Sequence, residues 1–295
     1  MSIIFIGLSG TVLFFVLSIF FFAFANRIVN IAINTQAINL QNLYRRKING
    51  SFHGLWSLGG IAGVGFTTFM VALDVSIEKH FYIISAVLLA ATVLPFGSLL
   101  KNDKSQTTTK LSWKTTDPKI IMLGVIALLG ATCEGGMYDW SGVYFEEVIK
   151  ADIFTTGYFV FMAFMTTSRL FSDWLIQHLG MLRMFSISAA LIASGITLAV
   201  ILPTYWAALI GFSCVGMGAA SIIPMTFTLG GTLTKYSTGM AVSIISTFTM
   251  VGILLGPPII GYIAHAAGLR GSFLFMTLAA LLIIPMSKRY FSMCA

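Results

Sequence analysis

The feature that most constrains this chain is a succession of long apolar stretches separated by short polar ones. A helix needs about 20 residues to cross the roughly 30 Å hydrocarbon core of a bilayer. Only 9% of the 295 residues are charged, whereas a soluble domain usually has about 25%. Most of the surface therefore cannot face water. The sequence predicts an all-α, polytopic membrane helical bundle with about nine spans, at residues 3–26 (running on to 38), 55–73, 81–100, 119–143, 153–171, 182–202, 205–229, 238–264 and 270–287.

The distribution of basic residues agrees with nine spans. Lysine and arginine concentrate on the cytoplasmic side of membrane proteins, and this division puts 13 of them on one side, 3 on the other and Arg27 inside a span. The net charge of +7 is then a topology signal and not a sign of a nucleic-acid partner. The C-terminus is predicted to be cytoplasmic and Met1 external. The 13 residues are Arg45, Arg46, Lys47, Lys101, Lys104, Lys110, Lys114, Lys119, Arg169, Arg183, Lys235, Lys288 and Arg289; the other 3 are Lys79, Lys150 and Arg270.

The longest polar stretch divides the chain into two predicted domains. Residues 101–118 are rich in lysine and threonine and end at Pro118, a residue that favours a helix start. We expect a partial N-terminal bundle of three spans at 1–100, a cytoplasmic linker at 101–118 and a six-helix bundle at 119–295.

Polar side chains inside the spans need a reason, because a charge at the bilayer centre costs about 2.5–3.5 kcal/mol on insertion scales. Asn26, Asn30 and Asn34 recur every four residues and form one stripe. The stripe either lines a cavity for a polar solute or joins helices by amide hydrogen bonds. His53 and Trp56 share a face of the second span. They either line the same cavity or lie at its edge, as a capping histidine and an interfacial anchor.

The fourth span carries two carboxylates in the run GATCEGGMYDWSGVYF. Glu134 lies well inside the span and shares a face with Tyr138, so it is predicted to carry a proton or bind solute. The alternative is a structural ion pair, for example with Arg27. Asp139 points elsewhere and either lines the path or reaches outer water.

Two further patterns indicate packing and motion. Arg169 and Asp173 are four residues apart and can pair with each other or with neighbouring helix ends. The run GILLGPPIIG places Gly252, Gly256, Pro257 and Gly261 in one span. Glycine permits close helix contact and proline kinks a helix, which suits a moving bundle and a static one alike.

Several kinds of chemistry have no motif in the sequence. There is no phosphate-binding GxxxxGK[ST] run, no HExxH pair and no GxSxG elbow. The three cysteines show no metal or disulfide spacing, and two of them lie in apolar stretches that favour packing. We therefore expect no enzyme, no cofactor and no metal.

Taken together, these residues resemble the major facilitator superfamily, in particular its bacterial branch of fucose permease-like sugar porters. The resemblance rests on NIAINTQ (30–36), GSFHGLWSLGG (50–60), EGGMYDWSGVY (134–144), the RLxxD core of 169–173 ending at Gly180, and GPPIIG from residue 256.

The resemblance implies twelve helices in two halves that rock around a central site. On that scheme the first three helices are missing, and the chain looks like a truncated transporter. Asn30 and Gln41 stand where the family often has acids, which puts proton coupling there in doubt and leaves Glu134 and Asp139 as candidates. The resemblance also implies that Arg169, Asp173 and Gly180 form a cytoplasmic gate.

The predicted function is a secondary transporter of a small polar solute, such as a sugar, by alternating access, with proton coupling left open. Asn30, Asn34, His53, Trp56, Glu134 and Trp140 would line the path. The protein is expected to lie in a lipid bilayer, the bacterial inner membrane. It is expected to be a monomer if the chain is complete. The alternative is a truncated, non-transporting membrane protein with a structural or regulatory role.

Overall fold

The computed structural model describes residues 2–44, 47–100 and 117–294, and every regular element within them is helical. Most of the predicted linker, residues 101–116, lies outside the described residues. The elements are α1 (Ser2–Gly7), α2 (Val12–Leu43), α3 (Asn49–Ala72), α4 (Ile77–Val93), a short 3₁₀ turn η1 (Phe96–Ser98), α5 (Pro118–Glu147), α6 (Thr156–Leu179), α7 (Met181–Ile201), α8 (Tyr205–Gly230) and α9 (Thr238–Ser292).

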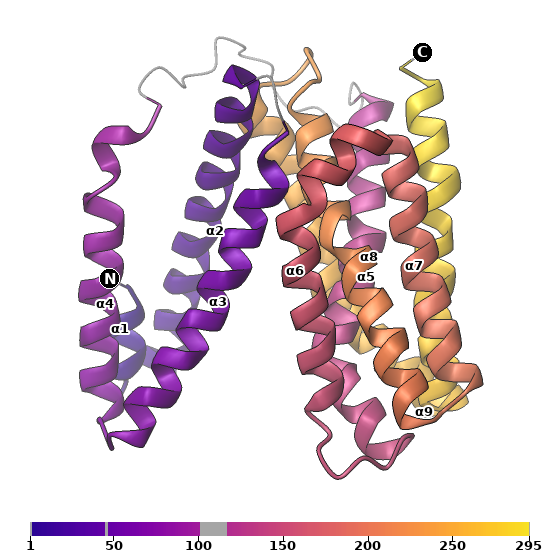
Figure 1. The fold of residues 1–295 in the computed structure, drawn as a ribbon. Helices are drawn as coiled ribbons and strands as arrows, with labels where there is room; N and C mark the ends of the chain where they lie inside the picture. The colour runs from indigo at the N-terminus through magenta and orange to yellow at the C-terminus, as the bar shows by residue number, and fades with distance from the viewer. Residues whose placement is uncertain (1, 45–46, 101–116, 295) are drawn as a thin grey trace.

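Local sequence signals explain where several helices begin and turn. The first predicted span is not continuous: the Thr11 hydroxyl accepts the Phe14 N–H at 3.3 Å and starts α2 after a break. Pro118 is the first residue of α5, and the Asp117 carboxylate accepts the Lys119 N–H at 2.8 Å. Within α9, Gly268 has φ 74° and ψ 165°, a conformation that favours glycine. The chain reverses there, so α9 consists of two antiparallel helices (Figure 1).

The predicted all-α membrane bundle is confirmed. Within the described ranges, six elements are long and apolar enough to cross a membrane: α2, α4 with η1, α5, α7, α8 and α9. The two parts of α9 hold two of the predicted spans. The count of nine spans stays a prediction.

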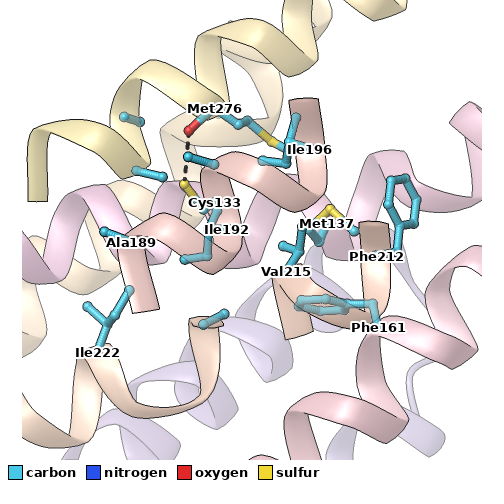
Figure 2. Packing of buried hydrophobic residues seen from close by; sticks show 14 of the residues in the cluster. Cys133, Met137, Phe161, Ala189, Ile192, Ile196, Phe212, Val215, Ile222 and Met276 are labelled. Carbon is cyan, nitrogen blue, oxygen red and sulfur yellow. Dashed lines mark hydrogen bonds between the residues drawn. The ribbon is translucent and has the colours of Figure 1, made fainter. Parts of the chain in front are cut away.

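The helices form two groups, α1–α4 and α5–α9 (Figure 1). The second group surrounds a large apolar core of side chains from all five of its helices. Figure 2 shows part of this core, where the Cys133 thiol donates to the carbonyl oxygen of Met276 at 3.5 Å. Cys133 has no exposed surface, which fits the packing role predicted for it.

A seam of glycines joins α5 to α9 inside the second group. A Cβ at Gly252 would lie 2.5 Å from the carbonyl oxygen of Leu128, and one at Gly256 would lie 3.2 Å from the Cα of Thr132. From the other side, a Cβ at Gly135 would lie 3.2 Å from the Cα of Ile253. The two backbones therefore touch without intervening side chains.

The two groups meet toward one end of the bundle. This is the end that holds the α2–α3, α6–α7 and α8–α9 connections and the C-terminus (Figure 1). Among the described residues, the hydrogen bonds between helices of the two groups run from Arg27 in α2 and from the first nine residues of α3, Asn49 to Ser57. Farther along both helices the side chains are exposed, as with Phe20 at 62% and Ile61 at 53%. The groups thus contact each other at the basic end and diverge beyond it.

Candidate functional site

A buried ion pair lies where the two helix groups meet. In α6, the Arg169 guanidinium contacts the Glu134 carboxylate of α5 at 3.0 Å, and their side chains are 3% and 6% exposed. Arg169 lies in the middle of α6, so its assignment to a basic connection was wrong; the residue serves as a counter-charge. Glu134 is thus ion-paired, with Arg169 and not Arg27 as its partner, and its role as a proton carrier or solute ligand stays a prediction.

The pair is extended by neutral groups from both helix groups. The Tyr138 hydroxyl donates to the same Glu134 oxygen at 2.6 Å, as their shared face predicts. Arg169 also donates to the Ser57 hydroxyl of α3 at 2.7 Å. Its guanidinium lies 5.9 Å from the centre of the Trp56 ring, within range of a cation–π contact. Arg169 therefore connects the carboxylate of one group to a hydroxyl and an indole of the other.

The cluster keeps hydrogen-bonding capacity that the described residues do not use. The second oxygen of Glu134 and the Nε of Arg169 are buried and have no partner among them. The same holds for the hydroxyls of Ser141 and Thr166. Buried polar atoms in proteins are rarely left unpaired. A carboxylate oxygen and a guanidinium N–H together offer an acceptor and a donor to a polar solute.

The N-terminus of α3 is held by side chains of two other helices. The first four N–H groups of a helix have no partner within it. Here the Gln41 side chain of α2 accepts from Ile48 and Asn49, at 3.0 and 3.1 Å. The Asp173 carboxylate of α6 accepts from Gly50 at 2.9 Å and from Ser51 at 2.6 Å.

Space as well as charge shapes this contact. A Cβ at Gly50 would lie 2.0 Å from the Ser172 hydroxyl and 2.9 Å from an Asp173 oxygen, so only glycine fits without a shift. Asp173 thus bonds to a neighbouring helix end and not to Arg169, which was one of the two possibilities left open. Gly180, the end of the same motif, has φ 77° and terminates α6.

Two more α3 residues contact α8. The Asn49 amide donates to the carbonyl oxygen of Pro224 at 2.8 Å and to the Thr228 hydroxyl at 3.2 Å. The His53 ring stacks on Phe227 with centres 6.1 Å apart, and its buried Nε2 has no described partner. His53 and Trp56 therefore both face the second helix group.

The asparagine stripe lies partly within α2 itself. The Asn34 amide donates to the Asn30 carbonyl oxygen at 2.8 Å and to its side-chain oxygen at 3.3 Å, and Asn26 is exposed. On the same face, Arg27 donates to the Ser246 hydroxyl of α9.

The remaining predicted residues lie beyond the ion pair along α5. Asp139 is exposed. The Trp140 indole N–H donates to the carbonyl oxygen of Pro257 at 3.1 Å, and a Cβ at Gly261 would lie 2.8 Å from the indole ring. Trp140 and Gly261 thus hold the proline-containing part of α9 against α5.

Sequence reasoning missed Gln41, Asn49 and Ser57 as contact residues. Ser57 follows His53 by one helical turn, which is the signal that could have found it. Within the described residues, no group of three or more histidine, cysteine or acidic side chains could hold a metal ion.

Known proteins resemble this chain in sequence. Residues 1–237 match the family profile of the Major Facilitator Superfamily. An uncharacterized MFS-type transporter of Yersinia pestis is 31% identical over 88% of this chain and 69% of its own length. Membrane protein MosC of Rhizobium meliloti is 28% identical over 91% of this chain and 66% of its own. The chain thus spans about two thirds of the length of these relatives.

Solved structures show the same fold. The E. coli fucose:proton symporter FucP superposes with a TM-score of 0.73 over 94% of this chain and 77% of its own, at 17% identity. FucP in the outward conformation gives 0.63 over 76% of this chain and 57% of its own. The helical architecture, the profile match and the transporter relatives agree, and this integral membrane protein belongs to the Major Facilitator Superfamily of transporters.

Proposed function

We propose that the protein is a secondary transporter that moves a small polar solute across a bacterial inner membrane by alternating access. The observation that carries this proposal is the Arg169 contact, which joins Glu134 of α5 to Ser57 of α3 at the junction of the two helix groups. The Arg169–Glu134 pair lies within the second group, whereas the hydrogen bond from Arg169 to Ser57 forms only while the two groups are closed at that depth.

The arrangement supports one specific state of such a cycle. The groups contact each other at the end with the basic connections and diverge at the other. If that end is cytoplasmic, as the basic residues predict, the structure is the outward-facing state. Asp173 then closes the cytoplasmic side by capping α3, and separation of α3 from α6 opens it.

Glu134 is the proposed coupling residue. One of its oxygens is bound by Arg169 and Tyr138, and the other has no described partner. A proton or solute hydroxyl that reaches this oxygen weakens the ion pair, because the charge that holds Arg169 is reduced or shared. Loss of that pair frees Arg169 from its place beside Ser57. One structural neighbour is a fucose:proton symporter, which suggests a sugar-sized solute and a proton.

The test is uptake into proteoliposomes with and without an inward proton gradient, using a panel of sugars, sugar alcohols and sugar acids. We expect the gradient to drive accumulation in the native protein and in Glu146→Gln, a matched control at the exposed end of α5. Glu134→Gln should lose gradient-driven accumulation at least tenfold.

Two results would count against the proposal. Unchanged pH dependence in Glu134→Gln would remove this residue from the coupling step. A native protein that takes up no member of the panel, and that none of them stabilises against heat, would favour the non-transporting alternative.

A further inference from the structure

Arg27 lies deep in the membrane part of α2. It follows Val12 by 15 residues and precedes Leu43 by 16, the two ends of the helix. At 1.5 Å per residue the guanidinium-bearing position is about 22–24 Å from either end. A lipid headgroup at the membrane surface does not reach that depth.

The side chain of Arg27 turns toward the second helix group. Its Nη2 donates to the hydroxyl of Ser246, which is 1% exposed and lies on α9. Arg27 itself is half-buried. The cation therefore lies between α2 and α9, in the interface that alternating access would open and close.

No carboxylate balances this cation among the residues that the structure describes. Their one ion pair is Glu134 with Arg169. Asp173 is bound to the first turn of α3, and Asp117 caps α5. Ser246 supplies a neutral acceptor to one of five guanidinium N–H donors.

The contrast with Arg169 makes the absence informative. Two arginines lie at the junction of the same two helix groups, and one has a carboxylate, a hydroxyl and an indole around it. Charged residues inside a membrane are costly and, where they lack a structural partner, mark the path of a solute or ion. Guanidinium groups bind carboxylate and phosphate in a two-point geometry that a hydroxyl does not complete.

We infer that Arg27 binds the solute and that the solute is a small anion, bearing a carboxylate or phosphate on a polar body. This inference rests on the proposed function and names the substrate class. Asn30 and Asn34 follow Arg27 by three and seven residues, so they share its face of α2. Their amides suit hydroxyl groups on the body of such a solute, while Arg27 binds its charged group.

The test compares a neutral sugar with two anionic derivatives of the same sugar. Galacturonate and galactose form a carboxylate pair, and galactose 1-phosphate supplies the phosphate arm. Each is measured by uptake into proteoliposomes and by thermal stabilisation of the purified full chain in detergent. We expect the native protein to respond to one of the two anions at a concentration at least tenfold below that needed for galactose. The arm that responds identifies the anionic group.

The variants separate binding from structure. Arg27→Gln should lose the preference for the anion at least tenfold, and its unfolding temperature without solute should equal or exceed that of the native protein. Arg27→Lys should keep part of the preference. Ser246→Ala, which removes the described partner and keeps the charge, should retain it. Lys150→Gln, at an exposed position just beyond the end of α5, should change nothing.

Several outcomes would overturn the inference. A native protein that prefers galactose, or is indifferent to charge, contradicts it while leaving the transporter proposal intact. So does an Arg27→Gln protein that keeps the preference. If Arg27→Gln unfolds and Ser246→Ala loses the same stability without a change in preference, Arg27 is structural. Absence of uptake and of stabilisation by every solute contradicts both proposals.

Discussion

The seam between α5 and α9 and the junction between the two helix groups are held by different kinds of contact. In the seam, Gly252 and Gly256 bring two backbones into contact, and a methyl group would already clash at 2.5 Å from a carbonyl oxygen. At the junction the groups are joined by side chains with charges and hydroxyls, as in the contacts of Arg169 with Ser57 and of Asp173 with Gly50. The seam is therefore held by close backbone packing, and the junction is held by polar side-chain contacts.

The difference teaches which contacts can be exchanged. Close backbone packing depends on a tight fit between two surfaces, and even a small separation of the helices loses it. A hydrogen bond at the junction can be replaced by one to water or solute at small net cost. The seam therefore suits elements that move as one body, and the junction suits elements that part and meet again.

The largest expected effect is at Arg169. Arg169→Met leaves Glu134 buried without its counter-charge, and breaking a buried pair in this way costs about 3–5 kcal/mol. We expect a large drop in unfolding temperature in detergent. The double variant Glu134→Gln with Arg169→Met should recover most of it, because no charge is left buried. A double variant that is no more stable than the single one would show that the polar junction is not governed by charge balance.

A smaller loss is expected in the seam. Gly252→Ala places a methyl group against the backbone of α5, and overpacking of this kind costs about 1–3 kcal/mol. Gly59→Ala in α3 is the matched control, because a Cβ there meets nothing within 4 Å. Alanine gains up to about 1 kcal/mol over glycine in a helix, so the control should hold or raise stability. Thermal unfolding of both variants measures the change in stability. Equal unfolding temperatures would contradict a tight seam.

The smallest expected change in stability is at the α3 cap. Asp173→Asn removes the charge that accepts from Gly50 and Ser51, and loss of a helix cap costs about 1 kcal/mol. Hydrogen exchange at the N–H groups of Gly50 and Ser51 should then accelerate about fivefold, a factor that corresponds to about 1 kcal/mol of opening free energy. Exchange at Ile48 and Asn49, whose N–H groups are bound by Gln41, should not change. Gly252→Ala should leave exchange at both pairs unchanged. Global unfolding of Asp173→Asn would mean that the junction holds the whole chain together. It would contradict the distinction between a permanent seam and an exchangeable junction.

The sequence was a good guide to the helices because their signals are local. Apolar length, Pro118 and the basic connections each act within a few residues. The ion-pair partner of Glu134 was not predictable in the same way. It depends on which face of α6 meets α5, and no spacing within one helix reports that.

The predicted pairs within one helix show the same limit. Tyr138 and Glu134, one turn apart, do meet. Arg169 and Asp173 have the same spacing, yet each finds a stronger partner on another helix. A spacing rule states which side chains can meet, and the neighbouring helices decide whether they do.

The cap of α3 has a consequence for water. Gln41 is joined to α3 by a short connection and stays with it, whereas Asp173 belongs to α6. Any motion that separates α3 from α6 therefore leaves the N–H groups of Gly50 and Ser51 bare while those of Ile48 and Asn49 remain bound. Two bare donors cannot remain in a dry interface, so this end of the bundle can open only as fast as it hydrates. Dehydrating conditions that leave the helices intact should therefore hold the bundle in the closed arrangement seen here.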